Sequence, residues 1–339
     1  MKKLFLDNKI NISFLLIAFF WLVCILGVEN ISFQNTKWLH NGSDAAVHQL
    51  GWYFFQNDIW RFPLGNNPNF GDGFSSSIVF TDSIPLFALI FKLFKFILPE
   101  NFQYFSLWYF ITLYLQLFFS FKILKKFTNS DIYSFVGSLF FIISPFFMNR
   151  LGWHASVSAH WILLFTLYLG LTYKINQSKL SWFILIILTS LISYSFTAVT
   201  LVFYVLLRLF NFYYYRKDFF IIVKDLFVIL IFLLFVLYIV GYFEVRMADT
   251  LARGFGVYKL NLLSIFDPAA RLGSTGVSFS WLVPDFDLAR GEEIEGYNFI
   301  GLGGILMLII ISILLLKQNY RKKIFQIEKQ DLINNDNYQ

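Results

Sequence analysis

Long apolar runs separated by short polar segments dominate this chain. A helix needs about 20 residues to cross roughly 30 Å of hydrocarbon, with a range of about 17 to 25. Runs of this kind occupy residues 12–28, 104–123, 132–148, 157–173, 219–241 and 299–316. The stretch 180–210 is too long for one span, and its polar centre Ser193-Tyr194-Ser195 predicts two short helices that meet at a turn. The pattern therefore predicts eight membrane crossings.

The apolar run from Ile78 to Leu98 differs from the others because it contains charged residues. Asp82 lies near its start, and Lys92 and Lys95 lie near its end. A charge at the bilayer centre costs about 2.5 to 3.5 kcal/mol, so three in one lipid-facing span are unfavourable without partners. We therefore predict an amphipathic helix that lies along the outer interface.

Basic residues gather at one set of helix ends if Ile78–Leu98 does not cross. The positive-inside rule then makes both chain termini cytoplasmic. The inner segments hold Lys2, Lys3, Lys9, Lys122, Lys125, Lys126, Lys174, Lys179, Arg208, Arg216, Lys217, Lys224, Lys317, Arg321, Lys322, Lys323 and Lys329. Two large segments, 29–103 and 242–298, face outward and carry most of the acidic residues. Residues 1–316 are expected to form one membrane domain, and 317–339 a basic, disordered cytoplasmic tail.

Composition supports a membrane location. The chain has 339 residues, of which 58% are hydrophobic and 14% charged, and that much apolar surface exceeds what a soluble core can bury. The net charge of +6 does not indicate nucleic acid as a partner, because the cations lie at the ends of apolar runs. The expected fold is an all-α polytopic membrane protein, with interfacial helices in the long outer loop after the first span.

The outer loop begins with a candidate acid–base pair. Asp44 and His48 lie four residues apart at the start of a predicted helix, so they share one face. A carboxylate beside an imidazole can act as a general base, or supply two ligands to a divalent cation. Alternatively, Ser43 or Asp44 caps the helix and His48 is an interfacial polar residue.

Asp82 also has two interpretations. It can cap a helix whose first turn contains Pro85. It can instead join Asp44 around a substrate headgroup, because Asn66, Asn67 and Asn69 lie between them in a loop able to fold back.

A third group of candidates lies between two predicted spans. Arg150 and His154, followed by His160 at the start of the next span, place a cation and two imidazoles on the outer side. Arg150 suits a lipid phosphate. The same residue types also anchor helix ends at membrane interfaces. Further along, Glu295 could line the same cavity or be a solvated acid.

Several motifs together resemble a known kind of protein. The order of elements resembles that of the GT-C superfamily of membrane glycosyltransferases. It begins with a cytoplasmic N-terminus and one span, followed by an outer loop with an early acidic motif and a surface helix containing Asp-x-x-Pro-Leu. The segments Asp44–Trp52, Trp60–Gly65, Ser77–Leu86 and Glu295–Gly303 resemble more closely a bacterial multi-pass family of unknown function related to that superfamily. The similarity covers about residues 12–316.

This resemblance implies an activity and a set of roles. The protein would move a sugar from a polyprenyl-phosphate donor to a cell-envelope glycan or lipid acceptor, at the outer face of the bacterial inner membrane. Asp44 would be the catalytic base, with His48 and Asp82 in the catalytic group. Contacts to substrate would come from Trp52, Arg61, Arg150, His154, His160 and Glu295. The alternative is a non-catalytic lipid or polysaccharide transporter, or an envelope-assembly scaffold.

Overall fold

The computed structural model describes residues 2–40, 44–70, 76–172, 179–215, 219–244, 262–270, 277–278, 280–284 and 299–317. The chain divides into two compact units, unit 1 (Met1–Ala248) and unit 2 (Asp249–Gln339). The regular secondary structure of the described residues is helical apart from one pair of two-residue strands in unit 2 and an isolated bridge between Asn66 and Ser77.

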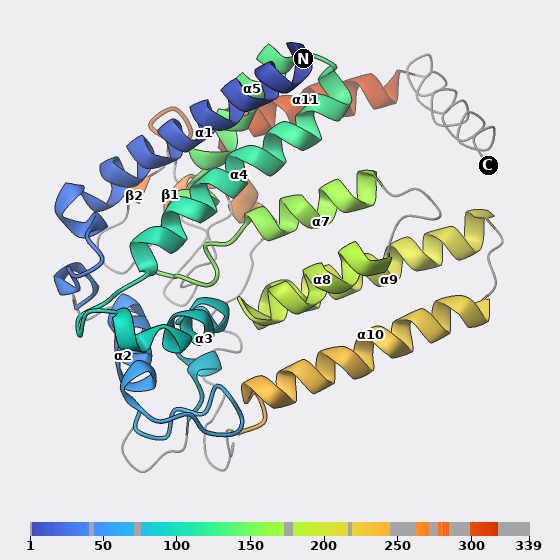
Figure 1. Ribbon diagram of the computed structural model, residues 1–339. Helices are drawn as coiled ribbons and strands as arrows, with labels where there is room; N and C mark the ends of the chain where they lie inside the picture. The colour runs from blue at the N-terminus through green and yellow to red at the C-terminus, as the bar shows by residue number, and fades with distance from the viewer. Residues whose placement is uncertain are drawn as a thin grey trace. The chain divides into compact units, whose positions relative to one another are not determined.

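Long helices make up most of unit 1 (Figure 1). They are α1 (Lys2–Leu26), α4 (Phe105–Thr128), α5 (Asp131–Ile142), α7 (Trp161–Leu171), α8 (Lys179–Ser190), α9 (Tyr194–Tyr215) and α10 (Phe219–Val240). Between α1 and α4 the chain forms α2 (Asp44–Asn57), α3 (Pro85–Leu93) and the 3-10 turns Val28–Ile31, Lys37–Leu39, Ile78–Phe80 and Lys95–Ile97. The short helix α6 (Pro145–Met148) precedes α7.

Unit 2 contains one apolar helix and a small strand pair. A 3-10 turn covers Leu262–Ile265, β1 (Ala269–Ala270) pairs antiparallel with β2 (Val277–Ser278), and α11 covers Gly301–Leu316. Most side chains of α11 are exposed and apolar.

A helix lies at every predicted span, but length separates them into two groups. Three are long and apolar enough to cross a membrane: Asn8–Leu26, Phe105–Thr128 and Phe219–Val240. The other apolar helical stretches among the described residues have 10 to 17 residues, including the Tyr194–Phe210 part of α9. The apolar helices agree with a membrane protein, whereas helix length alone does not establish eight crossings.

Proline and turn chemistry explain where the helices differ from the predicted ranges. The predicted span 132–148 breaks after Ile142, because Pro145 disfavours helical backbone before it and begins the separate helix α6. The predicted turn within 180–210 is confirmed at 191–193, between α8 and α9. The predicted helix 78–98 is wrong as one element, since only Pro85–Leu93 is α-helical.

Two clusters of buried side chains hold unit 1 together. In the larger, α4 packs against α1, α5 and α7, with Trp108 and Leu113 buried along it. In the smaller, Trp182, Tyr204 and Ile229 join α8, α9 and α10. The outer surface of α10 remains apolar, with Phe220 80% exposed, as expected for a helix that faces lipid.

Candidate functional site

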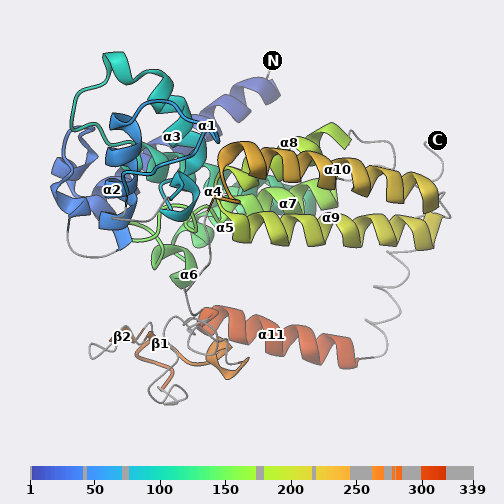
Figure 2. The same ribbon diagram turned by 90° about the horizontal axis from the view of Figure 1, so that it is seen from below.

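Three segments meet at one end of the unit 1 helices. They are the N-terminus of α2, the loop 81–84 that precedes α3, and the turn 149–158 that precedes α7; we call this region the site end. Both views place α2 and α3 together at this end of the helices (Figures 1 and 2). Two aspartates and two histidines from these segments form two neighbouring pairs.

Asp44 pairs with His154 across two of these segments. The His154 Nδ1 atom lies 3.2 Å from Asp44 Oδ2. The Asp44 side chain is 61% exposed, so its carboxylate remains open to a substrate. As the first residue of α2, Asp44 also lies where the helix dipole favours a negative charge.

His48 is buried and links the same segments through backbone groups. Its Nδ1 lies 2.9 Å from the Thr81 carbonyl oxygen, and its Nε2 lies 3.1 Å from the Trp153 carbonyl oxygen. An imidazole with one proton donates to only one of these oxygens, whereas an imidazolium donates to both. Because both ring nitrogens face carbonyls and only 3% of the side chain is exposed, His48 is suited to position the loop and the turn.

Asp82 lies near His48 but is held by another side chain. Its Oδ2 is 4.0 Å from His48 Nε2, and the Ser156 hydroxyl donates a hydrogen bond to its Oδ1. The carboxylate is 39% exposed. The two pairs are neighbours, because Asp44 and His48 lie one helical turn apart and Asp82 contacts the second of them.

The loop around Asp82 has an unusual backbone. Asp82 has φ +55° and Ile84 has φ +52°, a region that costs of order 1 to 3 kcal/mol for a residue other than glycine. Of the two interpretations of Asp82, the helix cap does not hold: Ile84 occupies the cap position and Pro85 begins α3, as expected. Asp82 instead faces Ser156, and strained backbone of this kind concentrates at functional sites.

Close packing against Gly51 fixes the loop on α2. A Cβ atom at Gly51 would overlap Thr81 and lie 2.8 Å from the Ser83 hydroxyl. The Ser83 hydroxyl donates to the His48 carbonyl oxygen at 2.7 Å. The Thr81 and Ser83 hydroxyls are themselves hydrogen-bonded at 2.7 Å. Only glycine at position 51 allows this approach.

Hydrogen bonds from the long helices hold the loop 81–84, the turn 149–158 and the chain that follows α2 in place. Tyr104, at the start of α4, donates to the Ser83 carbonyl oxygen. The Trp108 indole donates to the Ala155 carbonyl oxygen at 2.6 Å, which ties down the turn 149–158. At the end of α10, the Ile239 carbonyl oxygen accepts from the Leu64 backbone at 2.7 Å.

Tyr242, which follows α10, also lies close to the site. Burial raises the pKa of its phenol, and the negative charge of Asp82 raises that pKa further. The phenol donates to the Ser190 carbonyl oxygen at 2.8 Å, so it connects the site end to α8. Sequence spacing does not indicate this residue, because 160 positions separate Tyr242 from Asp82.

Two predicted substrate-binding residues lie elsewhere. Trp52 is a core residue: it is fully buried and its indole donates to the Phe102 carbonyl oxygen at 2.9 Å. Arg61 pairs with Asp58 beyond the C-terminus of α2, about 20 Å of helix away from Asp44. The hydrogen bond from Arg61 lowers the pKa of the Asp58 carboxyl.

The remaining predicted residues have different positions. Arg150 is half-buried in the same turn as His154, whose backbone nitrogen donates to the Arg150 carbonyl oxygen. His160 precedes α7 and lies between the Phe147 and Phe196 rings, with centroids 5.8 and 6.1 Å away. Glu295 lies outside the described residues.

The carboxylates and imidazoles at the site end form pairs rather than one cluster. Among the described residues, no three or more His, Cys, Asp and Glu side chains are grouped so that they could hold a metal ion. Asp44 and His48 do not converge, because one pairs with His154 and the other faces two carbonyls. In this arrangement Asp44 and His48 do not offer two ligands to one cation.

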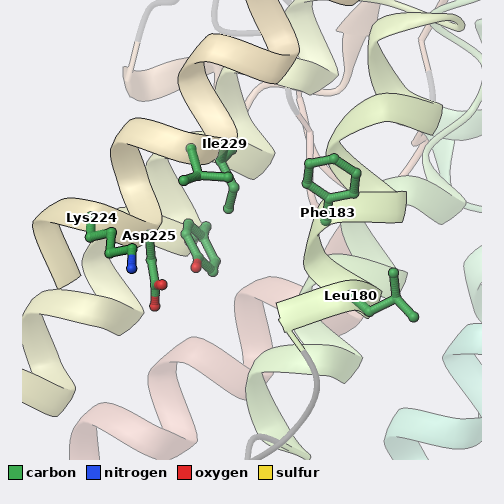
Figure 3. Close-up of a pocket in the computed structure, with 7 residues that line it drawn as sticks. Leu180, Phe183, Lys224, Asp225 and Ile229 are labelled. Carbon is green, nitrogen blue, oxygen red and sulfur yellow. The ribbon is translucent and has the colours of Figure 1, made fainter. Parts of the chain in front are cut away.

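A pocket occurs at a different place in unit 1. It has a volume of about 240 Å³ and lies between α8, α9 and α10, with Phe183, Tyr204, Lys224 and Asp225 in its lining (Figure 3). The sequence pattern predicts only that Lys224 is one of the basic residues on the inner side, and it gives no signal for Asp225.

Comparison with protein families assigns the chain to a group. The sequence profile of DUF6311, a domain of unknown function, matches residues 15–331, which is nearly the whole chain. The chain belongs to the DUF6311 family. Neither a curated protein nor a solved structure matches it. The match confirms the expected membership of a family of unknown function. Any link between this DUF6311 chain and glycosyltransferases is a proposal.

Proposed function

We propose that this DUF6311 protein is a membrane glycosyltransferase of the GT-C kind, which moves a sugar from a polyprenyl-phosphate donor to an envelope glycan or lipid acceptor. One observation carries the proposal. Two partly exposed carboxylates come from two parts of the first outer loop: Asp44 pairs with His154, and Asp82 accepts a hydrogen bond from Ser156. The buried His48 links them, because it lies one helical turn from Asp44 and 4.0 Å from Asp82. A general base needs this combination of exposure and fixed position.

The proposed reaction is a direct displacement at the anomeric carbon. Asp44 accepts the proton of the acceptor hydroxyl while that oxygen forms a bond to the sugar. The bond from the anomeric carbon to the phosphate oxygen breaks, and polyprenyl phosphate leaves with the electron pair. The sugar's configuration inverts. Arg150 and His154 stabilise the donor's phosphate, and Asp82 orients the acceptor.

The distribution of charge supports the proposed membrane arrangement. Lys122, Lys125 and Lys126 lie at the end of α4 remote from the site, and Lys126 donates to the Leu171 carbonyl oxygen at the end of α7. We call this the basic end; it also includes Arg208 of α9 and Lys224 of α10. The positive-inside rule makes it cytoplasmic, with eight helices crossing the plasma membrane of a bacterium and the site at the outer face.

The decisive experiment measures sugar transfer. Full-length protein in lipid is incubated with a panel of polyprenyl-phosphate sugars and envelope acceptors, and products are analysed by mass spectrometry. We expect Asp44→Asn to reduce the transfer rate by about 10² to 10⁴, the usual contribution of a general base. Asp58→Asn is the matched control, because this aspartate lies at the opposite end of α2 and pairs with Arg61.

Each outcome distinguishes the alternatives. Equal transfer by the wild type and Asp44→Asn would remove Asp44 as the base. Lipid or glycan movement across vesicles without a new glycosidic bond would favour the transporter. Absence of both activities across the panel would favour the assembly scaffold.

A further inference from the structure

The pocket at the basic end combines apolar walls with one cation. Leu180 and Phe183 of α8 and Val228 and Ile229 of α10 line a volume of about 240 Å³. Figure 3 shows Phe183 and Ile229 on opposite sides of it. This volume is below the roughly 300 to 1,000 Å³ of sites for drug-sized ligands. The pocket therefore fits a hydrocarbon chain rather than an entire drug-sized molecule.

The rim of the pocket continues into the lipid-facing surface. Leu180 is 62% exposed and Val228 is 51% exposed, so apolar side chains border the opening. Transfer of a chain from surrounding lipid into this opening requires no passage through water.

The charges beside the pocket are arranged unequally. Arg208 Nη2 lies 2.5 Å from Asp225 Oδ2, and Arg208 Nε donates to the Tyr204 phenol at 2.9 Å. Both members of the ion pair are at most 10% exposed. Arg208 therefore compensates Asp225 inside the protein.

Lys224 differs from its neighbour Asp225 in exposure and pairing. Its side chain is exposed, and among the described residues no carboxylate pairs with it. Figure 3 shows that Lys224 and Asp225 extend from the same stretch of α10 beside the pocket. Lys224 thus supplies an exposed positive charge beside the apolar pocket.

We propose that this pocket binds an anionic lipid, with a hydrocarbon chain between α8 and α10 and the phosphate at Lys224. The shared chemistry is a phosphate joined to a long apolar chain. A bilayer phospholipid and a prenyl phosphate both provide it. The inference is independent of the proposed function, because the pocket contains no residue of the site end.

Native mass spectrometry of the full-length protein tests this site. Phosphatidylglycerol, phosphatidylcholine and a long-chain prenyl phosphate are titrated separately into the delipidated protein. We expect at least one of the two anionic lipids to bind more tightly than phosphatidylcholine. Lys224→Gln should weaken that binding about fivefold, as expected for loss of one basic residue near an anionic lipid.

Two further variants separate a specific pocket from general basicity. Val228→Trp fills the pocket from an exposed position and should also weaken binding, while thermal unfolding verifies that it folds. Lys122→Gln removes a lysine from α4 at the same end and should leave binding unchanged.

The inference is overturned if phosphatidylcholine binds as tightly as both anionic lipids, if no lipid binds, or if Lys224→Gln and Val228→Trp both retain wild-type binding. Preference for phosphatidylglycerol identifies a bilayer lipid as the occupant, and preference for the prenyl phosphate identifies a carrier lipid.

Discussion

The site end and the basic end of unit 1 both contain aspartates beside cationic or imidazole groups, but they expose them differently. At the site end, Asp44 and Asp82 are 61% and 39% exposed and belong to a helix start and a loop. At the basic end, Arg208 and Asp225 are at most 10% exposed and belong to two packed helices.

This difference separates two uses of a carboxylate. A buried carboxylate whose charge is compensated by a close cation joins two helices, as Asp225 does with Arg208. A carboxylate that keeps an open face while its other side is hydrogen-bonded can still accept a proton, as proposed for Asp44. Breaking each arrangement should therefore affect different properties.

Removal of one partner from the buried pair should give the largest loss of stability. Arg208→Met leaves Asp225 without its compensating charge and is expected to lower the free energy of unfolding by about 3 to 5 kcal/mol. The double variant Arg208→Met with Asp225→Leu should recover most of this loss, because no buried charge remains. Thermal unfolding in lipid measures both. Equal losses in the single and double variants would show that the pair is not energetically coupled.

A smaller effect is expected where α2 meets the loop around Asp82. Gly51→Ala forces the Thr81 and Ser83 backbone away from the helix, at a cost of about 1 to 3 kcal/mol for overpacking. The rate of sugar transfer should fall by more than the loss of folded protein explains, because the loop carries Asp82. Gly137→Ala on α5 is the control, since its added carbon meets only the Leu124 side chain. Unchanged transfer in Gly51→Ala would separate the loop position from activity.

Lys92 of α3 is a buried cation near the C-terminal end of α2, and it should give the smallest effect. Its ammonium lies 3.8 Å from the centre of the Phe55 ring and donates to the Ile59 carbonyl oxygen. Burial lowers the pKa of Lys92 to about 8 from 10.5, while the charge of Asp58 opposes this shift.

The direction of the pH effect follows from proton binding. Between pH 8 and 10.5 the unfolded chain binds more protons at this lysine than the folded protein does, so folding stability should rise with pH in that window. Below pH 8 both states are protonated and this contribution is constant. Lys92→Met should flatten the rise, by of order 1 kcal/mol because cation–π contact offsets part of the burial cost. Thermal unfolding at a series of pH values measures it, and an unchanged slope would contradict the assignment.

Local pattern was sufficient to predict most of the helices. Long apolar runs identified each of the long helices. The polar Ser193-Tyr194-Ser195 segment indicated the turn between α8 and α9. The start of α2 at Asp44 also agrees with the pattern. Pro145 was the local signal that could have predicted the break after α5.

The sequence by itself determined the helices, the membrane-like character and the region richest in candidate chemistry, because hydrophobic length and helix periodicity depend on neighbouring residues. Only the tertiary structure decided the partners: His48 with the Trp153 backbone over 105 positions, Asp82 with Ser156 over 74, and Arg208 with Asp225 across two helices. These contacts depend on how distant segments pack, which local sequence patterns do not specify. For the same reason Asp82, which has the sequence context of a helix cap, faces the site instead.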